Sequence, residues 1–341
     1  MCPEIPAVSY EPKVIIETPP YPKMVVITMV YPCNASCPHC PYNNSDIRSE
    51  YKDAPFMPDH TFRKIAEESG KHQAFMRISG AGEPMMHPQA TKLLRYAKEQ
   101  GCRVGLITNG SLFTEENTRA LLAANVDMIE FSVDACDPET YAVVRKRLKW
   151  DTLLANVRRF LTLRAEMGSK SNIVASGVNQ TSVDIDAVEA FWRNEIGVDN
   201  FIRRKFLTWG DNTSLDYSRS ADPSPYMDTE HEPCPFIFER VLIDTRGTVM
   251  GCPYDIGGGF VVGNVNETAL AEIWKCDSFE DYRRKHAALR GQDIAMCSRC
   301  PDWKYRSWTH NYWKVVRDAD QVRLEKVGGP TPTSNSLHEG G

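Results

Sequence analysis

Long apolar segments and an excess of basic residues are both missing from this sequence. No apolar run approaches the roughly 18 residues that a membrane-spanning helix needs. The first 23 residues carry charges and several prolines where a secretion signal would be apolar. The net charge is −5, so there is no general basic surface for a nucleic-acid backbone. These absences predict a cytoplasmic protein with neither a membrane nor a nucleic acid as its partner.

Cysteine is abundant instead, with 11 residues in the chain. Disulfides are disfavoured in the cytoplasm, so most of these thiols are expected to bind metal or to take part in chemistry. One early group has the spacing C-x3-C-x2-C and consists of Cys33, Cys37 and Cys40. A later group ends in C-x2-C and consists of Cys234, Cys252, Cys297 and Cys300. No special role is expected for the isolated Cys2, Cys102 and Cys276.

Strand-like and helix-like segments alternate along residues 23–210. Segments rich in apolar and β-branched residues predict strands at 23–31, 74–79, 102–108, 128–133, 171–178 and 200–207. Most of them are followed by an amphipathic helical pattern. Repeated strand–helix units favour an α/β fold with a parallel sheet and outer helices, either open or closed into a barrel. In such folds the functional residues gather at the carboxyl ends of the strands.

Composition also divides the chain into regions. Residues 1–22 form a proline-rich extension, and residues 211–232 are polar and rich in Ser, Asp and Pro, which is typical of a linker. Residues 233–327 form a second region, which contains a predicted hairpin at 240–252. Residues 328–341 are expected to be disordered.

The early cysteine group suits an iron–sulfur cluster with one open position. Three thiolates can hold three irons of a four-iron cluster, and the remaining iron can then accept a ligand from a substrate or cofactor. A zinc site made by Cys33, Cys37, His39 and Cys40 is the alternative. The loop directly follows the first predicted strand, which places it at the mouth of the predicted barrel.

This loop and the segments after the following strands together resemble the radical S-adenosylmethionine (radical SAM) superfamily. The signature of that family is C-x3-C-x2-C after the first strand of a partial (β/α)6 TIM-like barrel, with a Gly-Gly-Glu motif after the second strand. Here SGAGEP (79–84) stands in that place, with Ala81 where the first glycine is usual. The resemblance implies a [4Fe–4S] cluster held by three cysteines, with SAM on the open iron.

The resemblance also implies roles for the residues around SAM. Glu83, preceded by Gly82, is expected to bind the methionine amino group, and Arg145 to pair with the methionine carboxylate, which suits a planar guanidinium. His39 stands where the family usually has an aromatic residue near the adenine. TNGS (108–111) and SVDACDPETYAVVR (132–145) follow the third and fourth strands and supply the remaining expected contacts, Asn109, Ser132 and Asp134.

The four later cysteines resemble the ligands of the twitch form of the SPASM region, which follows the barrel in one branch of this superfamily. Four thiolates fill every iron of a cubane, so such an auxiliary [4Fe–4S] cluster is closed to substrate and suits electron transfer or shaping of the pocket. Gly247 permits a tight hairpin turn ahead of Cys252. From the residues alone, a structural zinc site is the alternative.

Cys136 follows the fourth predicted strand and is expected to line the active-site mouth. A thiol can give a hydrogen atom to a carbon radical, so Cys136 favours epimerisation after the 5′-deoxyadenosyl radical has removed hydrogen from the other face of a carbon. Dehydrogenation of a secondary alcohol to a ketone is the close alternative, with the auxiliary cluster taking the second electron.

The substrate expected from the resemblance is a small molecule. Twitch-bearing relatives include an aminocyclitol dehydrogenase and peptide-modifying maturases, and epimerases of sugar-containing antibiotics belong to the same superfamily. No peptide-clasping domain precedes the first predicted strand. We therefore expect a sugar-containing or aminocyclitol substrate in antibiotic biosynthesis, with an external electron donor such as flavodoxin or ferredoxin. Modification of a peptide is the further alternative.

Overall fold

The computed structural model describes residues 10–13, 15–43, 52–207, 209, 216–221, 233–255, 258–298 and 300. Most of the predicted barrel and much of the second region lie within these residues. Cys2, the tail expected at 328–341 and most of the linker expected at 211–232 lie outside them. In the part of the chain that is described, no helix is both long and apolar enough to cross a membrane.

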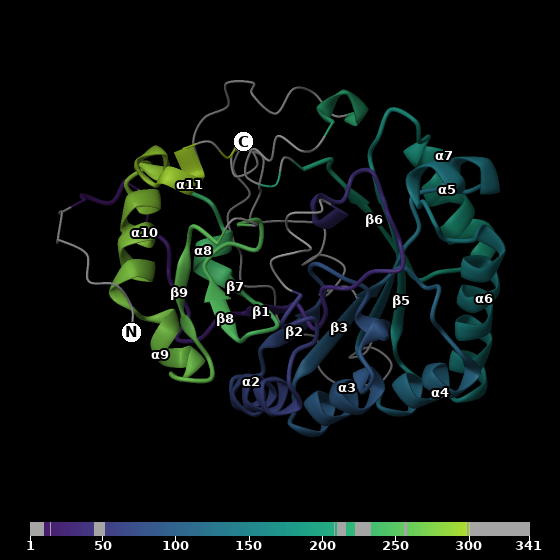
Figure 1. Cartoon of the computed structure of the whole chain (residues 1–341), viewed down its shortest axis with the longest axis horizontal. Coiled ribbons are helices and arrows are strands. Elements are labelled where there is room, and N and C mark those ends of the chain that lie inside the picture. Colours follow the sequence, from purple (N-terminus) through teal and green to yellow (C-terminus); the bar gives the residue numbers. More distant parts are fainter. Residues whose placement is uncertain are drawn as a thin grey trace, which may run out of the picture.

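A nine-stranded sheet forms the centre of the molecule, in the order β6-β5-β4-β3-β2-β1-β7-β8-β9 (Figure 1). The first six strands run parallel in chain order, as the alternating pattern predicted, and β7 adds to the other side of β1. The bounds are β1 Met24–Ile27, β2 Phe75–Ile78, β3 Arg103–Thr108, β4 Met128–Ser132, β5 Asn172–Val178, β6 Asn200–Arg204, β7 Arg240–Ile243, β8 Thr248–Met250 and β9 Val261–Asn264.

Helices cover the outer face of the parallel strands (Figure 1). They are α2 Asp59–Lys71, α3 Ala90–Glu99, α4 Glu115–Ala123, α5 Pro138–Val144, α6 Trp150–Glu166 and α7 Ile185–Ala190, which continues as a π-helical turn at Phe191–Ile196. Local sequence sets several of their starts. At α4 the Thr114 and Asn117 side chains each accept a backbone N–H of the other residue, which satisfies donors that the first turn leaves open. The described C-terminal helices are α8 Phe236–Glu239, α9 Leu270–Trp274, α10 Asp277–Ala287 and α11 Ala295–Ser298.

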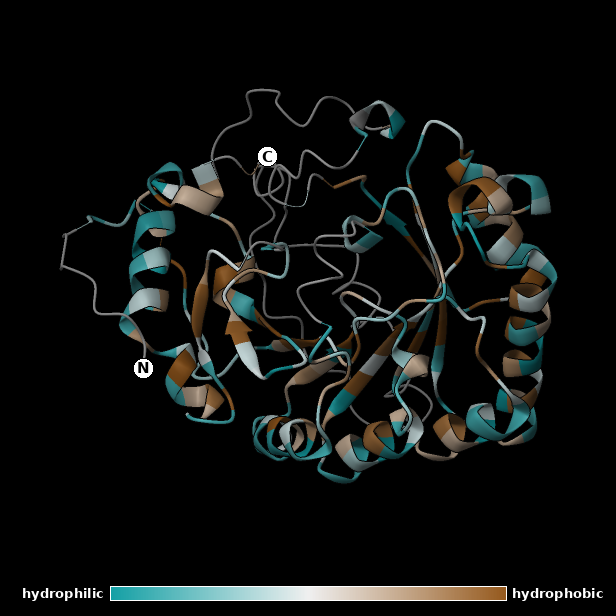
Figure 2. Ribbon diagram, viewed as in Figure 1, coloured by the Kyte–Doolittle hydropathy of each residue, from teal (hydrophilic) through white to brown (hydrophobic). Residues whose placement is uncertain are grey.

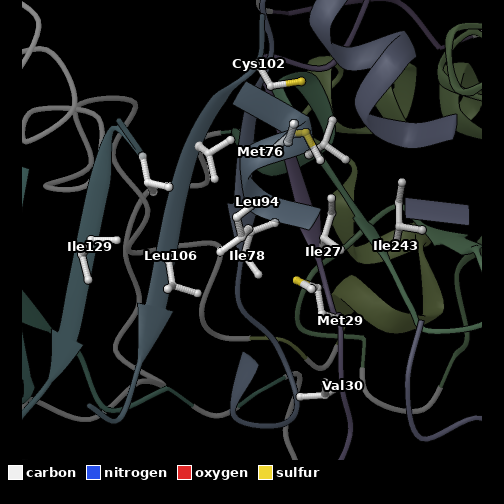
Figure 3. Packing of buried hydrophobic residues seen from close by; sticks show 14 of the residues in the cluster. Ile27, Met29, Val30, Met76, Ile78, Leu94, Cys102, Leu106, Ile129 and Ile243 are labelled. Atoms are coloured by element: carbon white, nitrogen blue, oxygen red, sulfur yellow. The ribbon is translucent and has the colours of Figure 1, made fainter. Parts of the chain in front are cut away.

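Strands β1 to β5 and β7 are buried on both faces, which explains their continuous apolar character. One face packs against the helices, and Figure 3 shows Ile27, Ile78 and Leu106 of three neighbouring strands in this layer. The opposite face carries a second cluster made of Met24, Val26, Phe75, Met128, Val174, Ile202, Leu242 and Met250. Apolar residues accordingly concentrate on the strands, whereas the helices carry hydrophilic stretches (Figure 2).

The first strand is shorter than predicted. It was expected at 23–31 but ends at Ile27, because the chain then pairs with residues 55–57 instead of with the barrel strands. The Tyr31 amide donates to the Pro55 carbonyl at 3.0 Å, and Val30 forms an isolated bridge with Phe56. The last parallel strand, expected at 200–207, likewise ends early, at Arg204.

The second region extends the barrel sheet rather than forming a sheet of its own. Residues Met24 to Ile27 of β1 pair in parallel with Arg240 to Ile243 of β7. The predicted hairpin is present as β7 and β8, which pair antiparallel. Gly247 has a φ of 79° in the turn between them, a conformation that suits glycine. This continuity brings the regions that hold the two cysteine groups into one body.

Candidate active site

Cys33, Cys37 and Cys40 lie on the loop that follows β1, as predicted. All three keep their thiols; Cys37 is buried and the other two are half-buried. Burial raises the pKa of these thiols, for Cys40 to about 12. They therefore need positive charge close by in order to ionise. An iron–sulfur cluster supplies that charge, so the loop fits the group that its spacing predicted.

A closed ring of side-chain hydrogen bonds ties the cysteine loop to the loop after β3. The Asn34 amide donates to Ser111 Oγ at 2.8 Å, the Ser111 hydroxyl donates to Asn109 Oδ1 at 2.6 Å, and the Asn109 amide donates to Asn34 Oδ1 at 2.8 Å. Because Asn34 directly follows Cys33, the ring fixes this part of the loop. The predicted residue Asn109 thus lies in the site, with its side chain engaged by the protein itself.

Glu83 is a buried carboxylate held by neutral donors. Its Oε1 accepts the Thr108 hydroxyl at 2.6 Å and the Met85 amide at 3.1 Å, and its Oε2 accepts the Asn109 amide at 2.7 Å. Burial raises the pKa of Glu83 despite these hydrogen bonds. Within the described residues, no Lys, Arg or His nitrogen forms an ion pair with it. The site can therefore take up an ammonium group, which fits the expected role for the methionine amino group of SAM.

Gly82 permits close packing between the Glu83 loop and the cysteine loop. A Cβ atom at this position would lie 2.3 Å from the Pro32 carbonyl oxygen and 2.7 Å from that of Val30. The neighbouring Glu83 amide donates to the same Pro32 carbonyl at 3.0 Å. The predicted Gly82 is thus needed at this position for a steric reason.

Asp134 gathers the expected residues on the other side of the cysteine loop. Its Oδ2 lies 2.8 Å from Arg145 Nε and 3.3 Å from His39 Nε2, and its Oδ1 accepts the Val178 amide at 2.7 Å. Arg145 Nη1 also contacts Cys37 Sγ at 3.7 Å. The structure therefore brings Asp134, Arg145 and His39 together beside Cys37, an expected cluster ligand.

The His39 ring is held in one orientation because each of its two nitrogens faces a partner side chain. Gln180 Nε2 lies 3.5 Å from His39 Nδ1, while Nε2 faces Asp134. Burial lowers the pKa of His39 to about 4, although Asp134 opposes this shift. The imidazole is thus neutral at pH 7. With both nitrogens directed to Gln180 and Asp134, the ring is not directed at the three cysteines, and this disfavours the alternative zinc site.

Among the described residues, no hydrogen bond or ion pair joins the remaining predicted residues, Ser132 and Cys136, to the Asp134 group. Ser132 ends β4, is half-buried and is paired in register with Ser176 of β5. Two residues later Asp134 has a φ of 58°, and the next carbonyl, that of Ala135, accepts the Trp192 indole N–H at 2.7 Å. The half-buried Cys136 has a pKa raised by burial and then by the carboxylates of Asp137, Asp184 and Glu195. Within the described part of the chain, no recorded contact joins its thiol to the Asp134 group.

The four later cysteines are all buried. They are Cys234, Cys252, Cys297 and Cys300, with exposed fractions of 4, 8, 7 and 8%. Cys234, Cys297 and Cys300 share an apolar cluster with Phe236 and Ile294. Two backbone amides orient the group: that of Cys234 donates to His286 Nδ1 at 3.2 Å, and that of Tyr254 donates to Cys252 Sγ at 3.4 Å.

Residues 27–180 match the radical SAM superfamily, and residues 234–301 match SPASM, an iron–sulfur cluster-binding domain. The first match contains the three-cysteine loop and the Glu83 and Asp134 groups, and the second contains the four buried cysteines. The chain belongs to the radical SAM superfamily. It is a radical SAM enzyme with a C-terminal SPASM region, as the sequence resemblance implied.

Radical SAM relatives match most of the chain at low identity. The tungsten-containing aldehyde ferredoxin oxidoreductase cofactor-modifying protein of Pyrococcus furiosus is 23% identical over 301 residues, covering 76% of this chain and 83% of that protein. The PqqA peptide cyclase of Xanthomonas campestris is 23% identical over 330 residues, with coverage of 84% and 82%. The structure of Streptococcus suis SuiB bound to precursor peptide SuiA has a TM-score of 0.64 at 14% identity, covering 88% of this chain and 74% of that one. At this identity the structural likeness shows the fold alone.

The radical SAM and SPASM regions imply a [4Fe–4S] cluster with SAM and a further iron–sulfur cluster. Within the described residues, no three Cys, His, Asp or Glu side chains are grouped around a single metal-ion position. A cubane spreads its ligands over several irons, so its thiolates need not converge on one point. The buried thiols fit the cluster, and the Glu83 carboxylate, which is held by neutral hydrogen-bond donors, fits the ammonium group of SAM.

Several residues of this site were missed in the sequence. Gln180 follows the end of β5 by two residues, so the rule that functional residues follow strand ends could have found it. Ser111 lies within the quoted TNGS segment, and Asn34 lies between two cysteine ligands. His286 has no such signal, because it comes from α10, 52 residues after its partner Cys234.

Proposed function

We propose that this radical SAM enzyme oxidises a carbon of its substrate by two electrons. When bound, the first cluster supplies the electron that splits SAM into methionine and a 5′-deoxyadenosyl radical, and the auxiliary cluster offers an acceptor for the electron that the substrate gives up. The substrate loses a hydrogen atom to the radical, then one electron and one proton. One electron enters per SAM cleaved and one leaves, so an external donor such as flavodoxin or ferredoxin only starts the cycle.

The burial of all four C-terminal cysteines carries this proposal. A cluster held by four protein thiolates has no open iron for substrate, so of its two expected roles, electron transfer and shaping the pocket, we propose electron transfer. Oxidation of a carbon radical requires an electron acceptor. Epimerisation requires a second hydrogen donor instead, and a thiol donor then needs one electron and one proton to be restored. We propose oxidation, which was the alternative in the sequence, because it uses the buried group directly as the acceptor.

Epimerisation with Cys136 as the hydrogen donor stays a prediction. It would require the Cys136 thiol to face the carbon radical near the cysteine loop. The charges that act on this thiol are Asp137, Asp184 and Glu195, and the preceding carbonyl faces Trp192. These neighbours support leaving Cys136 out of the proposed reaction.

The described residues suit SAM bound by its amino-acid end. The Glu83 carboxylate can accept the ammonium group while keeping its neutral donors. The Arg145 guanidinium has five N–H groups, so it can hold a methionine carboxylate while it keeps Asp134 and Cys37 as partners. Asp134 in turn fixes Arg145 and His39, which leaves little freedom in the groups around the reacting centre. Ser132, at the end of β4, remains a proposed contact to the ribose.

For the substrate, we propose a peptide. The PqqA cyclase, which matches most of both chains, acts on a peptide by its name, and the SuiB structure holds a precursor peptide. The sugar or aminocyclitol substrate and the antibiotic pathway expected from the sequence stay predictions. Both substrate classes present unactivated C–H bonds. Transfer of hydrogen from such a bond to 5′-deoxyadenosine can therefore be followed for either class in one experiment.

Isotope transfer tests the substrate class even while the substrate molecule is unidentified. Cells that contain the enzyme's substrate are grown once with perdeuterated amino acids and once with perdeuterated sugar, and each extract is separated into peptide and small-molecule fractions. The reconstituted enzyme with SAM and dithionite should form deuterated 5′-deoxyadenosine with the labelled peptide fraction. Deuterium transfer from the sugar-labelled small-molecule fraction alone would contradict a peptide substrate. Cys37→Ser provides the control without radical formation.

Solvent isotope tests the reaction type in the same samples. In deuterated water, an oxidised product gains no deuterium at the attacked carbon, whereas an epimer formed through a thiol donor gains one. Product that is two hydrogens lighter and free of solvent deuterium at that carbon supports oxidation. Product of unchanged formula that carries one solvent deuterium would overturn it.

A further inference from the structure

The tripeptide Cys-Pro-Tyr occurs in both cysteine groups. It ends the first loop as Cys40, Pro41 and Tyr42, and it follows β8 as Cys252, Pro253 and Tyr254. Each tyrosine thus lies two residues after an expected cluster ligand. The same spacing recurs at Phe236, which lies two residues after Cys234.

Trp209 lies between these two tyrosines. The centroid of its ring is 6.1 Å from that of Tyr42 and 4.7 Å from that of Tyr254, and both pairs are edge-to-face, with interplanar angles of 75° and 77°. Such geometry is the favoured one for aromatic pairs. Trp209 follows β6 and therefore comes from a third part of the chain. One indole side chain thus contacts both cluster-holding loops.

The contacts continue outward from both tyrosines. Phe236 lies 5.3 Å from Tyr254, and Tyr31 lies 6.4 Å from Tyr42, each between ring centroids. Trp209 itself has a φ of 54°, a left-handed conformation that is costly for a bulky residue and that persists only where the surroundings fix it. A row of five aromatic rings therefore runs from the start of the cysteine loop to the auxiliary region, with Trp209 at its centre.

We propose that Trp209 is a positioning residue that sets the spacing between the SAM-binding cysteine loop and the auxiliary cysteine loop. Aromatic side chains have few rotatable bonds, so contacts between rings transmit displacement better than contacts between long flexible side chains. A shift of the Cys40 loop on binding SAM must move Tyr42, and Trp209 passes that movement to Tyr254 and Cys252. The inference relies on the cysteine ligands and is independent of the proposed oxidation and of the substrate.

The test compares Trp209→Ala with Trp209→Phe in anaerobically reconstituted full-length protein. With both clusters reduced, pulsed EPR measures the magnetic interaction between them, and hydrogen exchange measures opening of the segments 28–43 and 248–255. Loss of two aromatic contacts should speed exchange in both segments about tenfold or more and broaden the inter-cluster distance distribution. Trp209→Phe, which keeps a ring, should stay within about twofold of the wild type.

The second measurement asks whether a change in one cysteine loop alters hydrogen exchange in the other. Tyr254→Ala should speed exchange in the segment 28–43, although Tyr254 belongs to the other loop, and adding Trp209→Ala should increase the effect little further. SAM should protect the segment 248–255 in the wild type but not in Trp209→Ala. Where the alanine variant loses iron, Trp209→Leu takes its place, because it removes the ring but keeps more apolar side chain than alanine does. The proposal is wrong if spacing and exchange of both loops stay as in the wild type, or if leucine substitutes fully for tryptophan.

Discussion

Replacing Glu83 by glutamine should separate SAM binding from the stability of the protein. Burial raises the pKa of Glu83 above its ordinary value, so the native state binds a proton there more tightly than the unfolded state does. Its favourable contribution is therefore present at low pH and is lost as the pH rises through the raised pKa. The glutamine variant does not ionise, so its stability should not fall in this way as the pH rises. In the wild type, binding of SAM should offset the stability lost on ionisation of Glu83, because SAM brings an ammonium group to the carboxylate.

The hydrogen bonds of Glu83 give the size of the effect. Its carboxylate accepts two backbone amides and one hydroxyl, and a glutamine NH2 group must face at least one of these donors. The variant should therefore be less stable than the wild type at pH 5, by about 1–3 kcal/mol. At pH 8 the wild type carries the buried charge, so the difference should vanish or change sign. Affinity for SAM should fall by at least about 30-fold, the result of losing one partner of a buried charged pair.

Two assays on cluster-loaded protein decide the matter. Melting temperatures of both proteins are measured at pH 5 and pH 8, without and with SAM, and SAM dissociation constants are obtained by titration under anaerobic conditions. The reasoning is refuted if the stability difference between the proteins is the same at both pH values, or if Glu83→Gln binds SAM as the wild type does.

Three further predictions concern the loops around the clusters. Asn34→Ala and Ser111→Ala should each weaken SAM binding about tenfold with unchanged iron content, and their effects should not add in the double variant, because both side chains belong to one hydrogen-bonded ring. Ser36→Ala removes a hydroxyl that donates to Asn43 in the same loop and should leave affinity within about twofold. Additive effects of the first two substitutions would contradict the ring. Cys252→Ala should lower iron from about eight to about four per chain and abolish oxidised product while 5′-deoxyadenosine still forms, and full product from this variant would contradict the electron-acceptor role. Cys136→Ala should leave product formation unchanged, because the proposed oxidation needs no thiol donor. Loss of product from this variant would restore the epimerisation mechanism.

The sequence predicted those features that depend on local order along the chain. The spacing of Cys33, Cys37 and Cys40, the alternation of strands and helices, and the turn at Gly247 each involve neighbouring residues. The order of the parallel strands also followed, because consecutive strand–helix units pair side by side. The pairing of β7 with β1 could not be predicted, since two buried apolar strands carry no mark of their partner.

The contacts that organise the site join distant segments and were missed for that reason. Asn34 and Ser111 are 77 residues apart, and His39 and Gln180 are 141 residues apart. Proximity of this kind depends on packing, which periodicity does not encode. The place of Cys136 in the site stays a prediction, because it was drawn from nearness in sequence to Asp134 and no contact among the described residues tests it. The φ of 58° at Asp134 is a turn at a non-glycine residue, and such a turn is not readable from the residue types.

Formation of 5′-deoxyadenosine by the purified protein tests the central claim most directly. The protein is reconstituted with iron and sulfide under anaerobic conditions and incubated with SAM and dithionite, and 5′-deoxyadenosine and methionine are quantified by mass spectrometry. Wild-type protein should form both products, and Cys37→Ser should form neither. A colourless protein that retains zinc and leaves SAM intact under strong reductant would contradict the account.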